Sequence, residues 1–129
     1  MFQIDIMSRT PIYEQIITQA EKFILTGVLS GGDQIPSVRS VSTELSVNPI
    51  TILKAYNDLS SRELIQSVPG RGYFVCNDAK EKLSAGKLGL LDNVSSLAQE
   101  LALAGVPMEE VIWKIEEAYG KNCRKEDRV

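Results

Sequence analysis

The dipeptide Asn48-Pro49 constrains the fold of this chain more than any other short feature, because it fixes where a helix can begin. Proline inside a helix costs about 3 kcal/mol, but at the first helical position its missing N–H has no intrahelical partner to lose. The asparagine directly before it can accept hydrogen bonds from the first free N–H groups. We therefore predict a helix that starts at Pro49 with Asn48 as its N-cap. Its apolar face would consist of Ile52, Ala55, Tyr56 and Leu59.

A second, shorter helix is expected just before this one. Ser37 can cap it, and Val41 and Leu45 stand one turn apart on its apolar side. Only the short segment 46–48 then separates the two predicted helices. Two short helices joined by such a turn are typical of a helix-turn-helix.

The neighbouring segments complete a larger unit. Upstream, apolar residues at steps of three and four between Ile12 and Ile24 predict an amphipathic helix, and the alternation in residues 2–6 is a weak strand signal. Downstream, the β-prone runs LIQSV and YFV flank Pro69-Gly70-Arg71-Gly72, which predicts a hairpin with an arginine at its tip. Three helices and then such a hairpin make a winged helix, whose third helix enters the major groove of DNA.

A different pattern begins after residue 77. Asp78 and Glu81 have the spacing of a capping box, and apolar residues then recur at a coiled-coil-like spacing. This apolar stripe can pack either on the winged helix or on the same stripe of a second chain, and the second arrangement is favoured. The expected dimer interface consists of Leu83, Leu90, Val94, Leu97, Leu101, Val111, Ile112 and Ile115.

These patterns predict a mainly α fold with a small β-hairpin. Residues 1–77 are assigned to an N-terminal winged helix-turn-helix domain. Residues 78–129 are assigned to a short helical dimerisation domain with a charged tail.

Composition excludes several classes of function. The 129 residues include no histidine, which removes the Ser-His-Asp arrangement and most zinc sites, and no Gly-rich phosphate loop of the P-loop type is visible. We therefore expect no enzyme activity, no catalytic residues, no metal and no cofactor. Cys76 and Cys123 lack ligand spacing and are expected to be reduced thiols. With no export signal and no apolar run near the roughly 18 residues of a membrane span, a cytoplasmic protein without a membrane partner is expected.

The segments TPIYEQI, GDQIPSVRSVSTELSVNPITILKAYNDL and GRGYFV closely resemble the DNA-binding domain of the GntR family of bacterial transcription regulators. The short helical tail resembles that of its YtrA-like subfamily, whose members dimerise through it. The resemblance implies that double-stranded DNA is a partner. The DNA-binding residues that it implies are Ser37, Arg39, Asn48, Pro49, Ile50, Thr51, Lys54, Gly70, Arg71 and Gly72.

The resemblance also implies roles for some of these residues. Arg39 matches a DNA-contacting arginine at the start of the second helix, and Thr51 matches a position that contacts phosphate. Lys54 matches a basic position on the recognition helix. Arg71 lies at the wing tip, where Gly70 and Gly72 would let the backbone approach DNA and the arginine would reach into the minor groove.

The sequence departs from the family pattern at the recognition helices. Ser40 stands where relatives often carry glutamate, and Ile50 and Leu53 are apolar where many relatives carry polar residues. Ile50 could contact a thymine methyl group or pack under the first helix.

The formal net charge of −3 is unusual for a protein that binds DNA. However, Arg39, Lys54 and Arg71 all fall on the expected DNA face, and the local distribution of charge governs the field near the phosphates. A binder with few phosphate contacts is therefore expected.

We predict a sequence-specific DNA-binding transcriptional regulator that binds a palindromic operator as a homodimer. A repressor is favoured because a dimer on DNA suffices to block polymerase, and the resemblance suggests transporter genes as targets. The alternative is a winged helix that contacts only proteins, which would fit the apolar Ile50 and Leu53. A small-molecule effector is left open.

Overall fold

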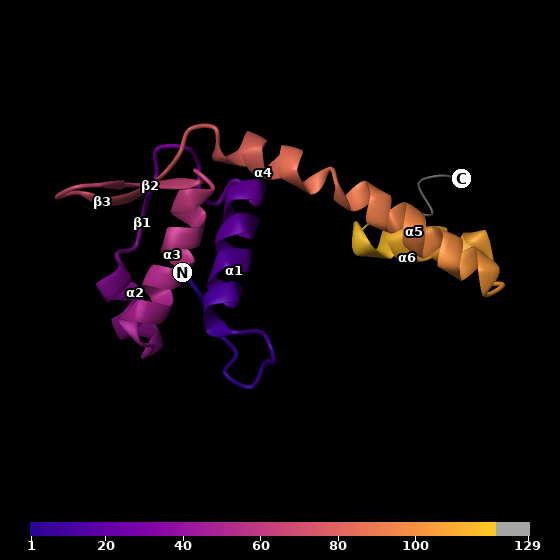
Figure 1. The fold of residues 1–129 in the computed structure, drawn as a ribbon, viewed down its shortest axis with the longest axis horizontal. Helices are drawn as coiled ribbons and strands as arrows, with labels where there is room; N and C mark the ends of the chain where they lie inside the picture. Colours follow the sequence, from indigo (N-terminus) through magenta and orange to yellow (C-terminus); the bar gives the residue numbers. More distant parts are fainter. Residues whose placement is uncertain (121–129) are drawn as a thin grey trace. The chain divides into compact units, whose positions relative to one another are not determined.

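The chain forms two compact units, which are described separately here. The structure is a computed structural model, and it describes residues 1–120. The first unit spans Met1–Gly86 and the second begins at Lys87 (Figure 1). Cys123 and the charged end of the expected tail lie outside the described residues. Within residues 1–120 no helix has both the length and the apolar character needed to cross a membrane.

Three helices and a small sheet build the main body of the first unit. The helices are α1 (Ile12–Thr26), α2 (Val38–Leu45) and α3 (Pro49–Ser61). The strands are β1 (Gln34–Ile35), β2 (Ile65–Val68) and β3 (Gly72–Val75). They form an antiparallel sheet in the order β1-β3-β2. The predicted winged helix-turn-helix is therefore confirmed, and the hairpin β2–β3 extends away from the helices in Figure 1.

β1 is the strand that the sequence analysis did not predict. The expected hairpin forms with Ser67 opposite Tyr73, and the loop before α2 then adds Ile35 on the other side of the same Tyr73. β1 contains only two residues, which is too short for an alternating pattern to be visible in the sequence.

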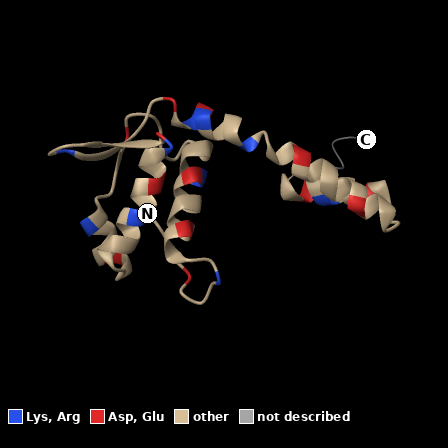
Figure 2. Ribbon diagram, in the orientation of Figure 1, with Lys and Arg blue, Asp and Glu red and all other residues tan. Residues whose placement is uncertain are grey.

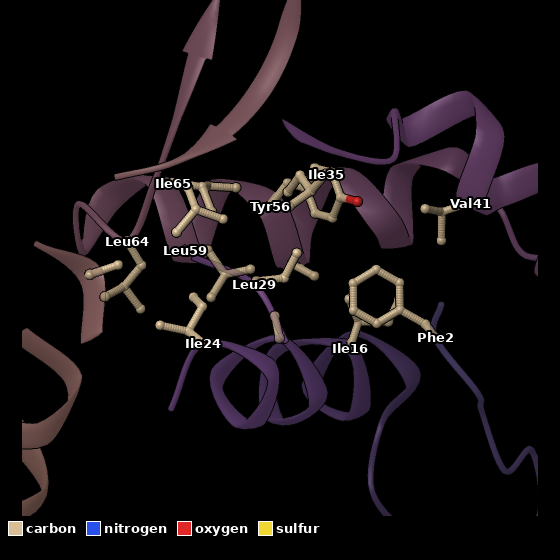
Figure 3. Close-up of a cluster of buried hydrophobic side chains, with 14 of the residues drawn as sticks. Phe2, Ile16, Ile24, Leu29, Ile35, Val41, Tyr56, Leu59, Leu64 and Ile65 are labelled. Atoms are coloured by element: carbon tan, nitrogen blue, oxygen red, sulfur yellow. The ribbon is translucent and has the colours of Figure 1, made fainter. Parts of the chain in front are cut away.

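Buried apolar side chains from all six elements hold the first unit together. Figure 3 shows Ile16 and Ile24 of α1 facing Tyr56 and Leu59 of α3, with Leu29 between the two helices. All four residues predicted for the apolar face of α3 are buried: Ile52, Ala55, Tyr56 and Leu59.

Tyr56 connects the recognition helix to the segment that leads into α2. Its ring is completely buried and meets the ring of Tyr73 edge-on, with 5.0 Å between the ring centroids. Its hydroxyl donates a hydrogen bond of 2.7 Å to the carbonyl oxygen of Pro36. Burial raises the pKa of the Tyr56 phenol far above its usual value, so the group remains a neutral donor.

Removing this hydroxyl is expected to destabilise the fold. Tyr56→Phe should lower the free energy of unfolding by about 1 kcal/mol, because the Pro36 carbonyl loses its partner while the apolar packing is kept. Urea unfolding measures the change. The matched control is Tyr73→Phe, since the Tyr73 hydroxyl makes no hydrogen bond with a described residue. Equal losses in both variants would contradict the assigned role of the Tyr56 hydroxyl.

The first residues of the chain do not form the strand that their alternation suggested. Instead, glutamine side chains of α1 take the place of a neighbouring strand. Gln15 accepts from the backbone N–H of Asp5 at 2.8 Å and donates back to the Asp5 carbonyl at 3.0 Å. Gln19 makes the same pair of hydrogen bonds with the backbone of Gln3. The extended segment is thus paired with side chains, which leaves it outside the sheet.

Helix α4 (Ala79–Lys87) begins inside the first unit. Its residues Ala79 and Leu83 are buried in the core of that unit. Lys82 also holds it there, through its Nζ atom 2.8 Å from Glu63 Oε2 and 3.4 Å from Asp78 Oδ2. The sequence predicted a domain boundary after residue 77, whereas the first compact unit ends at Gly86 and so includes nearly all of α4.

The second unit is a helical hairpin of α5 (Leu90–Leu103) and α6 (Met108–Ala118). The chain turns between them at Gly105, whose φ of 84° lies in the left-handed region that favours glycine. Apolar side chains of both helices line a groove of about 350 Å³.

Candidate nucleic-acid interface

The turn between α2 and α3 is fixed by local hydrogen bonds. Ser37 caps α2, because its Oγ accepts from the backbone N–H of Ser40 at 3.0 Å. At the end of α2, Ser46 adopts a left-handed conformation with a φ of 55°. Ser42 Oγ donates to the carbonyl of Val47 at 2.6 Å across the same turn. These contacts set the angle at which the chain enters α3.

The predicted start of α3 is confirmed. Pro49 is the first helical residue, and Asn48 Oδ1 accepts from the backbone N–H of Ile50 at 2.9 Å. No acidic residue lies in the first turn of α3. The positive end of the helix dipole is therefore not neutralised by the chain itself, which favours a phosphate nearby.

The outward face of α3 combines apolar and polar side chains. Ile50 is 73% exposed and Leu53 is 40% exposed, so Ile50 does not pack under the first helix. Lys54 is also exposed, whereas Thr51 is half-buried. Ile50, Leu53 and Lys54 are therefore the side chains that this face of α3 presents to a partner.

Tyr13 is a residue of this surface that the sequence analysis missed. The Lys54 Nζ atom lies 4.0 Å from the centre of the Tyr13 ring, an arrangement typical of a cation–π contact. Tyr13 comes from the first turn of α1, and its hydroxyl donates to Glu14 Oε1 at 3.3 Å. The charge of Glu14, and then this hydrogen bond, raise the pKa of Tyr13. The ring therefore stays neutral beneath the lysine.

Tyr13 is expected to orient Lys54 for binding DNA. Tyr13→Leu should weaken DNA binding about twofold to fivefold, because an exposed cation–π contact contributes about 0.5–1 kcal/mol. Tyr13→Phe keeps the ring and should bind as the parent protein does. Both affinities can be measured by fluorescence anisotropy on one labelled duplex. If Tyr13→Leu weakens binding equally in a Lys54→Ala background, the ring does not act through Lys54.

The wing tip has the backbone conformation that its glycines predicted. Gly70 and Gly72 have φ values of 77° and 112°, which residues with a side chain rarely adopt. Between them Arg71 is exposed. Gln34 of β1 donates from Nε2 to the Arg71 carbonyl at 2.8 Å, and a Cβ atom on Gly72 would lie 3.0 Å from that same Nε2. Gln34 thus holds the wing tip, a role with no visible signal in the sequence.

Charge is distributed unevenly over the first unit. Figure 2 shows a basic segment at the tip of the β2–β3 hairpin, whereas α1, α2 and α3 each carry both basic and acidic segments. Arg62 is neutralised by Glu21 and Asp58, at 2.7 and 3.1 Å. In contrast, Arg39 and Arg71 are exposed and make no ion pair with a described residue. The two arginines are therefore available to an anionic partner despite the acidic total.

Within residues 1–120 no group of three or more His, Cys, Asp or Glu side chains could hold a metal ion. Burial raises the pKa of the Cys76 thiol, which disfavours the reactive thiolate.

A helix-turn-helix with an exposed recognition helix, followed by a hairpin with a Gly-Arg-Gly tip, defines a winged-helix DNA-binding protein. The family model described as bacterial regulatory proteins, gntR family, matches residues 12–75. Over 112 residues the chain is 39% identical to the HTH-type transcriptional repressor YtrA of Bacillus subtilis, a match that spans 86% of each protein. The chain belongs to the GntR family of DNA-binding transcriptional regulators, which are not enzymes.

Solved structures agree with this assignment. A GntR family transcriptional regulator from Listeria monocytogenes has a TM-score of 0.70 at 32% identity, and the match covers 88% of this chain and 98% of that one. The DNA-binding domain of AraR in complex with the operator ORX1 matches with a TM-score of 0.51 at 32% identity, over 59% of this chain and 93% of that one.

Proposed function

We propose that this GntR-family regulator is a repressor that binds a palindromic operator as a homodimer. The observation that carries the proposal is the exposed apolar face of the second unit. Val94 and Leu101 of α5 and Ile115 of α6 line its groove. A protein in water rarely leaves a large apolar patch uncovered unless another surface binds it.

A second copy of this chain is the occupant that fits the apolar face best. A two-fold dimer buries the same face of both chains and presents two recognition helices about 34 Å apart, one turn of the DNA helix. Such an arrangement requires a palindromic site. The similarity to the B. subtilis repressor extends beyond the first unit, since a match of 112 residues in this chain of 129 includes α5 and the beginning of α6.

The proposed interface differs from the expected stripe at one residue. Leu83 is only 5% exposed because it packs in the core of the first unit, so we leave it out. The proposed interface consists of Leu90, Val94, Leu97, Leu101, Val111, Ile112 and Ile115.

On the DNA side, we assign the contacts to the exposed residues of α2, α3 and the wing. Arg39 would reach a base edge or a phosphate from the start of α2, and Arg71 would enter the minor groove. The positive end of the α3 dipole, which has no acidic side chain in its first turn, would favour a nearby phosphate. Repression then needs no further surface, because a dimer on a promoter blocks polymerase. Transporter genes are the proposed targets.

Selection of bound duplexes from a random DNA pool tests this proposal. We expect a palindromic consensus whose affinity falls as salt rises, since each phosphate contact releases counterions. Sedimentation of the complex should give two chains per duplex, and transcription in vitro from a promoter carrying the consensus should fall. A consensus with a single half-site, bound by one chain, would contradict the dimer. A rise in transcription would contradict repression.

A further inference from the structure

Ile50 and Leu53 have no role in the fold that would explain why they are apolar. Both are exposed on the outward face of α3. Neither belongs to the buried core, nor to the half-buried apolar residues that pack against it. They lie three residues apart on one helix, which places them side by side with about 5–6 Å between their Cβ atoms.

Some of the polar groups next to Ile50 and Leu53 are already engaged within the protein. Pro49 has no donor, and Asn48 Oδ1 is already bonded to the backbone N–H of Ile50. Lys54 lies over the Tyr13 ring on the side of α3 that faces α1. Ile50 and Leu53 thus form an exposed apolar surface that an apolar group of the DNA would complement. The exposed Asn57, one turn after Leu53, remains available for a polar contact beside it.

We propose that Ile50 and Leu53 recognise the 5-methyl groups of thymines in the major groove. This inference rests on the proposed binding of a specific operator. The thymine methyl is the apolar group that base pairs display in the major groove, and it is absent from the other three bases. Successive bases on one strand are about 3.4 Å apart, so the spacing of the two side chains places the methyl groups one or two base steps apart. Each half-site of the operator then contains a pair of nearby thymines.

Deoxyuridine provides the test, because it differs from thymidine only by the missing methyl group. Each thymine of the selected operator is replaced in turn. We expect about fourfold weaker binding at two positions in each half-site, the effect of one buried methyl group. Changing the same position in both half-sites should weaken binding about sixteenfold.

Protein variants assign each methyl group to a side chain. In Ile50→Ala the deoxyuridine penalty should vanish at one of the two positions and persist at the other, and Leu53→Ala should give the reverse. The matched control is Val28→Ala, which shortens an apolar side chain that is exposed outside α2, α3 and the wing. This control should keep both penalties.

The outcomes separate this inference from the proposed function. A palindromic operator that lacks thymines in its half-sites, or that tolerates deoxyuridine at every position, would overturn methyl recognition while the regulator still binds DNA. Penalties that persist in both alanine variants would also overturn it. If no duplex is enriched, the operator proposal fails and the inference fails with it.

Discussion

Replacing Arg39 with alanine is expected to weaken binding to the selected operator about tenfold to hundredfold, with no change in thermal stability. The side chain is exposed and makes no ion pair with a described residue, so the fold does not depend on it. A good bidentate contact between arginine and a base contributes about 1–3 kcal/mol of discrimination. Arg71→Ala should have a similar effect through the wing, for the same reason.

The dependence of binding on salt separates the two kinds of contact that Arg39 could make. If it binds a phosphate, Arg39→Ala should reduce the slope of log affinity against log salt by about one and weaken all duplexes equally. If it reads a base, specificity at one position should relax. Arg39→Lys is informative because it keeps the charge and loses the planar fork of donors. It should rescue a phosphate contact and fail to rescue a bidentate base contact.

Lys22→Ala is the control for loss of charge alone. Lys22 is an exposed cation of α1 that does not belong to the predicted DNA-binding residues. Its removal should therefore reduce the affinity for the operator much less than Arg39→Ala does. If Arg39→Ala and Arg71→Ala bind operator as tightly as the parent protein, the assigned DNA face is wrong.

Features of the candidate DNA interface that depend only on neighbouring residues could be predicted from the sequence. The caps Ser37 and Asn48, the proline at the start of α3 and the glycines at the wing tip each follow from the conformation of a few neighbouring residues. In these cases the residue type itself fixes the backbone, so reading the sequence was sufficient.

Contacts between distant segments could not be predicted in this way. Gln34 reaches the Arg71 carbonyl across 37 residues of sequence. The contact of Tyr13 with Lys54 joins α1 to α3. Neither residue belongs to a periodic pattern, because each acts through the polar or aromatic end of a single side chain. The same limit applies to residues 2–6, where alternation indicated extended backbone but not that glutamine side chains would pair with it.

Leu83 marks a different limit of periodicity. Its spacing from Leu90 and Val94 continues the stripe of α5, yet it is buried in the core of the first unit. A repeat of apolar residues identifies the buried side of a helix, but it does not say which partner covers that side. Two glycines, Gly86 and Gly89, lie between Leu83 and the first residue of α5. A Cβ atom on either glycine would meet nothing within 4 Å, so close packing does not explain why these positions are glycines.

Introducing a charge on the proposed dimer face is expected to have the largest effect on assembly. Leu97 lines the groove between α5 and α6 and is 58% exposed in the single chain. Leu97→Glu should therefore leave each chain folded, while an unpaired carboxylate buried between two chains costs about 3–5 kcal/mol. Sedimentation should then give a monomer at concentrations where the parent is a dimer.

Loss of the dimer should also remove most of the operator affinity. Two linked half-site contacts can exceed the affinity of one by about 10²–10⁴-fold. The Leu97→Glu variant should therefore bind a single half-site as tightly as the parent protein does, but it should lose the additional affinity that the parent gains by binding both half-sites. Leu103→Glu is the matched control, because it places the same charge on α5 at a residue that is 90% exposed and does not line the groove. It should remain a dimer with full affinity. A dimeric Leu97→Glu variant would locate the interface elsewhere, and a monomeric variant with full operator affinity would show that dimerisation is not what makes binding tight.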